Sequence, residues 1–342
     1  MAVRAFRNLV DADVDLPDAG CVIVGRNGHG KTSLIEALLY TETFRSFRRA
    51  SDAELVRFGA DGFHVEAGRV AVGYDARTKE KKIVVNGVLP ERMADAIGMV
   101  KGVVLSPADV ALVAGGPRER RRFLDVLLSI TAPGYVDALT RYRRAVAHRG
   151  RATPAEIEAW ERVIAECGAA IVAARCRWAE RWSDVWAELC AAMGETAVPR
   201  LEYRARTAGD ADAIGTALAA SRDRDRAVGR CTVGPHRDEL RLTIDGRPLR
   251  SFGSAGQQRT GALALRLLEA SCLEASGDGA LLCLDDAFAE LDATRSRRLG
   301  ELIEKRAAAG SQIVAAVPKE TDVPDVIGGL ARWTISDGRI SA

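Results

Sequence analysis

The chain has 342 residues, 47% of them hydrophobic, which is enough for a sizeable core in two domains or in one domain with a large insertion. Its formal net charge of +2 excludes a generally basic protein, so any nucleic-acid site must be a local patch. Seven cysteines without a C-x-x-C pair, and no apolar stretch of about 18 residues, argue against structural zinc, a disulfide framework and a membrane span. We therefore expect a cytoplasmic protein with reduced thiols that does not associate with a membrane.

The first segment is expected to form a sheet around a short glycine-rich loop. Apolar residues alternate with aspartates over residues 10–16, which predicts two short strands within residues 1–16, joined by a turn at residues 6–8. Residues 21–24 are an apolar run typical of a buried strand, and residues 33–40 have apolar side chains at helical spacing. Strand, glycine loop and helix follow one another in the order that phosphate binding requires.

Residues 25–32 fit the phosphate-binding pattern G-x-x-x-x-G-K-[ST] at every fixed position. Glycines let backbone N–H groups turn inward on the phosphates, and the helix N-terminus adds its positive dipole end. We expect Lys31 to reach the β and γ phosphates of ATP and to serve catalysis, and the Thr32 hydroxyl to hold Mg²⁺. His29 fills a variable position and is interpreted as a loop residue rather than a catalytic base. The residues expected to bind the nucleotide here are Gly25, Arg26, Asn27, Gly28, His29, Gly30, Lys31 and Thr32.

Residues 41–59 are polar and carry Arg45, Arg48 and Arg49. A loop beside the nucleotide, a DNA contact and an ordinary solvated loop are all compatible with this composition. Further strands are predicted over residues 63–72, 81–85 and 103–105, with an Asn-Gly hairpin turn at residues 86–87 leading to residues 88–89 and a helix start at Pro107.

The middle of the chain is predicted to be almost wholly helical, with a strand at residues 198–203. Trp178, Trp182 and Trp186 share one helix face, which favours a helix–helix contact over a platform for stacking bases. The arginines between residues 222 and 230 alternate with acidic residues, which favours a solvated face over a DNA groove.

A turn at residues 234–240 leads into a strand over residues 240–244, and Asp-Gly at residues 245–246 predicts a second hairpin. His236 and Arg237 lie in the first turn, where they could approach a phosphate or simply cap the turn.

Two later motifs complete a candidate ATPase. Residues 281–286 are an apolar strand that ends in Asp285 and Asp286; after a phosphate loop, we expect Asp285 to hold Mg²⁺ through water and Asp286 to orient or deprotonate the attacking water. Residues 251–259 precede a helix and supply a second anion-binding turn. Its expected nucleotide contacts are Ser254, Gly256 and Gln257.

Two phosphate-facing helix termini for one nucleotide predict a head-to-tail dimer, in which Ser254 of one subunit closes on the γ-phosphate held by Lys31 of the other. This is the arrangement of the ABC ATPases, and the order of the motifs matches it. Most of the chain separates Lys31 from Asp285, more than a compact phosphate-loop domain needs. We expect an α/β fold: an ABC-type ATPase head (a mixed sheet with a P-loop core and an antiparallel subdomain) split by an α-helical arm. The predicted head comprises residues 1–113 and 230–342, and the predicted arm, or lobe II, residues 114–229.

Several motifs outside the phosphate loop resemble the RecF family of bacterial recombination-repair ATPases. They are Phe6-Arg7-Asn8, Ser46-Phe47-Arg48, Leu105-Ser106-Pro107, Gly116-Pro117 with Arg120-Arg121-Arg122-Phe123-Leu124-Asp125, Gly234-Pro235-His236-Arg237-Asp238, Gly256-Gln257-Gln258-Arg259-Thr260 and Glu290-Leu291-Asp292. Three features depart from ABC ATPases in general. Asp286 stands where most have glutamate, residues 312–317 offer no histidine or threonine as a γ-phosphate sensor, and the loop at Ser106-Pro107 carries no clear glutamine.

The resemblance implies an ATP-dependent homodimer that binds single-stranded and gapped double-stranded DNA and is released by slow, DNA-stimulated ATP hydrolysis. It also implies work with RecR and RecO to load RecA at single-strand gaps, in recombinational repair, replication and the SOS response. An ABC-type ATPase serving another partner, such as a transporter subunit or a defence effector, and an adaptor that uses ATP structurally are the alternatives. For DNA we expect contacts to the phosphate backbone, with arginines at residues 45–49 and 118–122 as candidates; Arg120 to Arg122 could equally be salt-bridged as a hinge.

Overall fold

The computed structural model describes residues 1–277 and 279–341, which form two compact units. The first unit consists of Met1–Asp109 and the chain from Glu269 onward, and the second unit is Val110–Leu268. Among the described residues, no helix combines the length and the apolar character needed to cross a bilayer.

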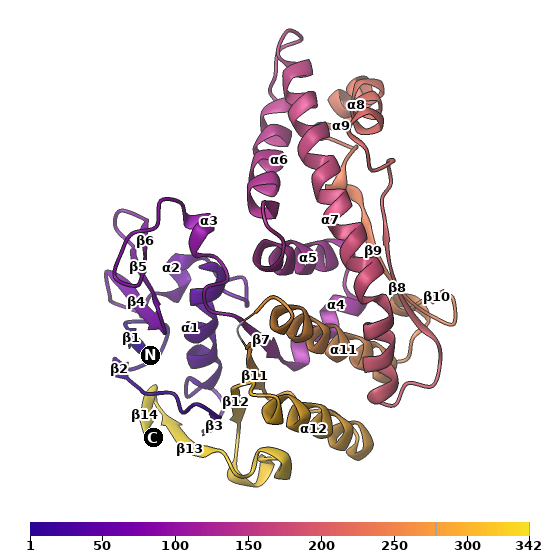
Figure 1. The fold of residues 1–342 in the computed structure, drawn as a ribbon. Coiled ribbons are helices and arrows are strands. Elements are labelled where there is room, and N and C mark those ends of the chain that lie inside the picture. Colours follow the sequence, from indigo (N-terminus) through magenta and orange to yellow (C-terminus); the bar gives the residue numbers. More distant parts are fainter. Residues whose placement is uncertain (278, 342) are drawn as a thin grey trace. The chain divides into compact units, whose positions relative to one another are not determined.

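A six-stranded sheet forms the centre of the first unit, in the order β14-β13-β3-β12-β11-β7 (Figure 1). Every neighbouring pair is parallel except β13 with β14. The central strands are buried along nearly their whole length, as expected of a parallel sheet covered on both faces. The strands are β3 (Gly20–Val24), β7 (Gly102–Leu105), β11 (Leu281–Asp285), β12 (Ile313–Val317), β13 (Ala331–Ser336) and β14 (Arg339–Ser341). The helices of this part are α1 (Lys31–Thr43) and α12 (Ala293–Ala308), with short 3₁₀ turns η3 (Glu320–Asp322) and η4 (Asp325–Ile327).

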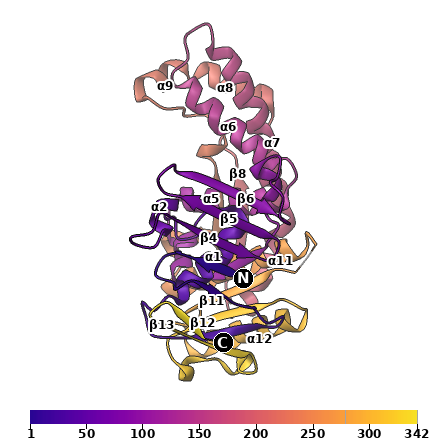
Figure 2. The ribbon, with the colours of Figure 1, turned by 90° about the vertical axis from the view of Figure 1, so that its left-hand side faces the viewer.

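A second, antiparallel sheet in the same unit has the order β2-β1-β4-β5-β6, and Figure 2 shows strands β4 to β6 side by side. Its strands are β1 (Ala2–Arg4), β2 (Ala12–Asp13), β4 (Gly62–Ala67), β5 (Val70–Asp75) and β6 (Glu80–Val85), accompanied by the short helices α2 (Asp52–Leu55) and α3 (Met93–Ala96). Phe6, Tyr40 and Phe63 pack edge to face, with ring centroids 5.2 to 6.1 Å apart, and join this sheet to α1.

Two strand predictions need correction in this sheet. The single strand expected over residues 63–72 is a hairpin, β4 and β5, which turns at Gly68 with φ +56°. The hairpin expected after Asn86-Gly87 is reduced to one isolated bridge between Val85 and Val88, with no following strand.

The second unit is mainly helical and includes a small antiparallel sheet of order β10-β9-β8. Its strands are β8 (Pro199–Arg204), β9 (Glu239–Ile244) and β10 (Arg247–Pro248). Its helices are α4 (Ala111–Ala114), α5 (Pro117–Thr131), α6 (Tyr135–Arg149), α7 (Ile157–Ala192), α8 (Ala211–Ala220), α9 (Arg222–Val228), α10 (Leu249–Phe252) and α11 (Ala255–Glu274), the last of which ends in the first unit; η1 (Pro107–Val110) and η2 (Pro235–Arg237) are 3₁₀ turns.

The division by compactness differs at one boundary from the expected division into head and arm. The second unit begins at Val110, close to the expected residue 114, but it extends to Leu268. One reason is strand pairing, since β9 follows the expected boundary at residue 229 and pairs along its whole length with β8, which precedes it. A second reason is that α11 packs on α7, where Trp186 is bonded to Gly261.

The tryptophan stripe lies on α7, and its two ends are core residues. Trp186 is fully buried and donates from Nε1 to the carbonyl oxygen of Gly261 at 3.2 Å. Trp178 is buried against Phe123 of α5, with ring centroids 6.1 Å apart. The predicted helix–helix contact is therefore confirmed for these two, while Trp182 is half-buried beneath the guanidinium of Arg181.

None of the seven cysteines forms a disulfide bond within the described residues, and five of them are buried. Burial raises the pKa of Cys21 to about 12 and also raises the pKa of Cys190 and Cys283. These thiols therefore pack as small apolar side chains.

Candidate nucleotide-binding site

The glycine-rich loop joins β3 to α1, as predicted, and its glycines occupy positions that other residues fill poorly. Gly28 and Gly30 have φ values of +85° and +111°. A Cβ on Gly25 would lie 2.4 Å from the carbonyl oxygen of Ile335, because β13 runs directly beside this end of β3. The loop therefore depends on glycine for both its conformation and its packing.

Lys31 is the first residue of α1, and its side chain is buried within the loop. Its Nζ donates to the carbonyl oxygen of Gly25 at 2.6 Å, to that of Arg26 at 3.3 Å and to Oδ1 of Asn27 at 3.4 Å. The ammonium group therefore lies against loop residues that are expected to surround the phosphates.

Thr32 and Asp285 meet where the carboxyl ends of parallel strands lie together. The Thr32 hydroxyl donates to Oδ1 of Asp285 at 2.9 Å. Burial raises the pKa of Asp285, and the hydrogen bond from Thr32 opposes that shift. A hydroxyl beside a carboxylate supplies the oxygen ligands that Mg²⁺ prefers, so the two residues fit the metal.

Asp286 follows directly, with its backbone in the left-handed region at φ +52°. Its Oδ1 is buried and has no hydrogen-bond partner among the residues that the structure describes. Burial raises the pKa of Asp286, the charge of Lys31 lowers it, and that of Asp322 raises it. A buried acceptor without a donor is costly, and a bound water would relieve that cost.

Glu36 is a residue of this region that the sequence patterns did not single out. Its carboxylate is fully buried in α1, where Arg7 binds both oxygens, at 2.9 and 3.0 Å. Ser46 donates to it through a short hydrogen bond, and Arg48 lies 3.4 Å away. The motifs at residues 6–8 and 46–48 thus meet on one buried carboxylate. The signal in the sequence was a glutamate on an otherwise apolar helix face.

The second anion-binding turn lies in the other compact unit, at the start of α11. Ser254 Oγ accepts from the backbone N–H of Gln257 at 3.2 Å, and Gln257 Oε1 accepts from the N–H of Ser254 at 2.9 Å. This reciprocal cap fixes the first turn of the helix, where Gly256 also lies, and leaves the Ser254 side chain exposed.

Several of the arginines proposed for DNA have partners within the protein. Arg120 is buried, with Glu239 at 2.8 Å and three backbone carbonyls within 3.2 Å, and Arg121 donates to the carbonyl oxygen of Asp238 at 2.7 Å. For Arg120 the structure supports the salt-bridged alternative, whereas Arg121 is held by a backbone carbonyl. Arg45 and Arg118 are exposed, and Arg48 is about half-exposed.

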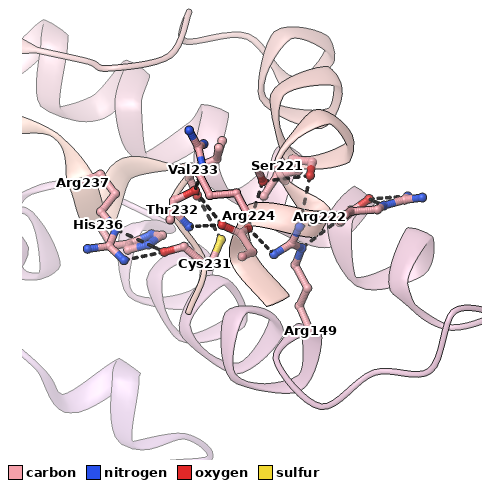
Figure 3. Close-up of polar contacts among 12 residues, drawn as sticks. Arg149, Ser221, Arg222, Arg224, Cys231, Thr232, Val233, His236 and Arg237 are labelled. Atoms are coloured by element: carbon pink, nitrogen blue, oxygen red, sulfur yellow. Dashed lines mark hydrogen bonds and ion pairs between the residues drawn. The ribbon is translucent and has the colours of Figure 1, made fainter. Parts of the chain in front are cut away.

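The turn containing His236 and Arg237 likewise binds its own chain (Figure 3). His236 Nε2 lies 3.0 Å and Arg237 Nη2 lies 2.6 Å from the same carbonyl oxygen, that of Cys231. Arg222 pairs with Glu161 at 2.6 Å, and Arg226 pairs with Asp223 at 3.1 Å. These contacts support the capping alternative for the turn, and they show that Arg222 and Arg226 are paired with acidic residues.

Comparison with known proteins identifies the family. Residues 21–316 match the family model described as "AAA domain, putative AbiEii toxin, Type IV TA system". "DNA replication and repair protein RecF" of Frankia alni is 35% identical, over 98% of this chain and 96% of that protein. The chain belongs to the RecF family. The RecF of Streptomyces avermitilis is 32% identical, over 99% of this chain and 98% of that protein.

Solved structures agree with the RecF assignment. "Structure of the recombination mediator protein RecF-ATP in RecFOR pathway" superimposes with a TM-score of 0.88 at 26% identity, covering 99% of this chain and 95% of that one. An Smc head domain from Pyrococcus furiosus has a TM-score of 0.55 at 15% identity, over 99% of this chain and 94% of that one, which shows a shared fold. The predicted ABC-type ATPase head fold is confirmed.

Proposed function

We propose that this RecF-family chain is an ATP-dependent DNA-binding protein of replication and recombinational repair. In the proposal, ATP closes a homodimer on single-stranded or gapped double-stranded DNA, and slow, DNA-stimulated hydrolysis releases it. The relatives named as DNA replication and repair proteins, and the RecF-ATP structure, support this assignment.

The observation that carries the proposal is the convergence of Lys31, Thr32, Asp285 and Asp286 in one compact unit. In the proposal, the loop residues 25–32 hold the phosphates of ATP, and Thr32 and Asp285 hold Mg²⁺. The metal supplies charge neutralisation at the phosphates when bound. Asp286 would accept a hydrogen bond from the attacking water through its unpartnered Oδ1. A shorter carboxylate than glutamate at this position suits slow hydrolysis.

The proposed dimer uses the turn at the start of α11 as its second phosphate contact. Ser254 is exposed, and its cap leaves the hydroxyl hydrogen available to donate. Gly256 and Gln257 would contribute the N-terminal end of a 20-residue helix to the partner's nucleotide. The functional head and arm are proposed as residues 1–113 with 230–342, and residues 114–229.

The DNA contact proposed here reads the phosphate backbone. Arg45 and Arg118 are exposed on the two units, and Arg48 is partly so. Phosphate contacts carry no sequence information, and binding through them weakens steeply with salt. Work with RecR and RecO, loading of RecA and a part in the SOS response are proposed from family membership, as is a cytoplasmic location.

The deciding experiment measures the mass of the protein in solution with Mg-ATP, with ADP and without nucleotide, each with and without gapped duplex DNA. Wild type is expected to dimerise with ATP and DNA together. Ser254→Arg places a bulky cation at the proposed dimer interface, and this variant is expected to remain monomeric. Ala220→Arg, which places the same cation at an exposed position at the end of α8 and outside residues 251–259, is the control and should dimerise.

Lys31→Arg tests whether ATP controls closure of the dimer, independently of the proposed contact at Ser254. It is expected to weaken closure or hydrolysis while the fold is retained. If the variant still dimerises and binds DNA in ATP as wild type does, the proposal that ATP closes the dimer on DNA is wrong. A wild-type protein that stays monomeric with ATP and DNA would favour an adaptor that uses ATP structurally.

A further inference from the structure

The phosphate-binding loop is held from outside by two segments far from it in the sequence. One is the turn after β1, and the other is the turn between β13 and β14. All three segments belong to the same compact unit. Neither turn is part of the phosphate-binding pattern, so that pattern does not explain why they contact the loop.

The turn between β13 and β14, here called the C-terminal turn, contacts His29, which fills a variable position of the loop. The backbone N–H of Asp337 donates to Nδ1 of His29 at 3.1 Å, and the N–H of Gly338 donates to the carbonyl oxygen of His29 at 3.0 Å. Since Nδ1 accepts, the neutral imidazole carries its proton on Nε2. His29 therefore contributes a side-chain acceptor that most residues at this position would lack.

The turn after β1 contacts the chain on either side of His29. Asn8 Nδ2 donates to the carbonyl oxygen of Gly28 at 2.9 Å, and Asn8 Oδ1 accepts from the hydroxyl of Ser33 at 2.9 Å. One amide side chain thus ties the loop backbone to the first turn of α1.

The two turns also hold each other. The N–H of Val10 donates to the carbonyl oxygen of Gly338 at 2.8 Å. Gly338 has φ +77°, and a Cβ there would lie 1.9 Å from the carbonyl oxygen of Asn8, so the turn can approach this closely only through glycine. Contacts therefore run in a closed ring from Asn8 to the loop, from His29 to the C-terminal turn, and from Gly338 back to residues 8–10.

We propose that His29 is a positioning residue of the nucleotide site, through which the β13–β14 turn fixes the shape of the phosphate loop. The proposal rests on the ATP binding proposed above. Gly28 and Gly30 give an unrestrained loop many conformations, and ordering it on binding costs free energy. A loop that is ordered beforehand binds more tightly without any new contact to the ligand.

The test compares His29→Ala with His29→Asn, because the Oδ1 of asparagine occupies nearly the place of the histidine Nδ1. We would measure the affinity for a fluorescent ATP analogue with Mg²⁺, and the unfolding temperature without nucleotide. Alanine is expected to weaken binding by roughly threefold to tenfold, the effect of one hydrogen bond, and asparagine is expected to restore it. Arg339→Ala is the control: it removes an exposed side chain from the same hairpin and should leave affinity unchanged.

Hydrogen exchange without nucleotide tests the same idea independently of ATP. In His29→Ala, the amides of residues 26–30 and of Asp337 are expected to exchange faster than in wild type, and in His29→Asn they should not. If wild type binds no ATP but these amides loosen in the alanine variant, the proposed function fails and the positioning role stands.

Two results overturn the positioning role. One is wild-type binding of ATP together with unchanged affinity and exchange in His29→Ala. The other is an equal loss in the alanine and asparagine variants, since the acceptor atom would then have no part in the effect.

Discussion

The hydroxyl of Thr32 donates to Asp285 at 2.9 Å, although 253 positions separate the two residues in the sequence. The bond joins the first turn of α1 to the end of β11, two strands away from β3 in the sheet order. It exists because β3 and β11 both pair in parallel with β12, so their carboxyl ends lie at one edge.

Asp285→Asn should weaken the binding of Mg²⁺ while the chain still folds. The amide oxygen can still accept from Thr32, but the charge that attracts Mg²⁺ is gone, so the gain in nucleotide affinity on adding Mg²⁺ should fall by about tenfold or more. Burial raises the pKa of Asp285, so its ionised form costs stability at neutral pH. Without Mg²⁺, the unfolding temperature of the variant should therefore rise. Titration calorimetry and thermal unfolding check the two effects, and an undiminished response to Mg²⁺ would rule out the assigned role.

Trp186→Ala should be strongly destabilising. The side chain is fully buried and donates to Gly261, so truncation leaves a cavity and removes that hydrogen bond, at a cost of about 3–5 kcal/mol. Half-buried Trp182 on the same helix is the matched comparison, and its replacement by alanine should cost about 1 kcal/mol or less. Chemical denaturation followed by circular dichroism measures both. Equal losses would mean that the stripe does not divide into core and surface as described.

Arg149 should be a sensitive charged residue of the helical unit. It is buried and bonded to Glu161 at 2.9 Å and to Asp225 at 2.7 Å, beside Ser221 and Arg222 (Figure 3). Arg149→Met removes the guanidinium that faces the buried carboxylates of Glu161 and Asp225. It should lower the free energy of unfolding by about 3–5 kcal/mol. The exposed pair of Arg226 with Asp223 is the control, where Arg226→Ala should cost about 0.5 kcal/mol or less. A small loss at Arg149 would show that the carboxylates find other partners.

Because His236 is partly buried, we expect the stability of the folded chain to fall as the pH drops. Burial lowers the pKa of His236 below 6.5, with Arg237 and Arg121 adding to the shift and the Cys231 carbonyl and Asp238 opposing it. The unfolded chain then binds more protons than the folded chain just below that pH, so stability falls as the pH drops.

His236→Gln should show a lower unfolding temperature at neutral pH, because the contact with Tyr142 at 2.5 Å is altered. Its unfolding temperature should also change less with pH between about pH 5 and pH 7. Thermal unfolding across this range is the measurement. Parallel curves for the variant and wild type would assign the pH dependence to other groups.

Sequence patterns predicted the parts of the site that are local. The loop at residues 25–32 and the strands at 21–24 and 281–285 carry their own signals, because glycine spacing and apolar runs reflect nearby backbone geometry. The hairpin inside residues 63–72 was missed although the alternation changes phase at Gly68: the buried positions are odd-numbered in β4 and even-numbered in β5. A single strand would keep one phase, so this shift was the signal of a turn.

Other features could not be predicted because their partners are distant in the sequence. Arg175 is buried and binds Tyr135, Tyr203 and Asp125, yet on its helix it is one arginine among several. Arg120 is buried within a run of arginines that suggested a surface for DNA. His29 fills a position where the pattern permits any residue, and only the folded chain places Asp337 beside it.

The buried thiols have a practical consequence for chemical labelling. Maleimides and similar reagents react with thiolates, and burial raises the pKa of Cys21, Cys190 and Cys283 while also shielding them from the reagent. A cysteine introduced at an exposed site should therefore react well before these three. Of the native thiols, Cys176 and Cys231 are the ones to replace first, since each is partly accessible. Pairs of dyes placed in this way, one on each compact unit, would report whether the distance between the units depends on nucleotide.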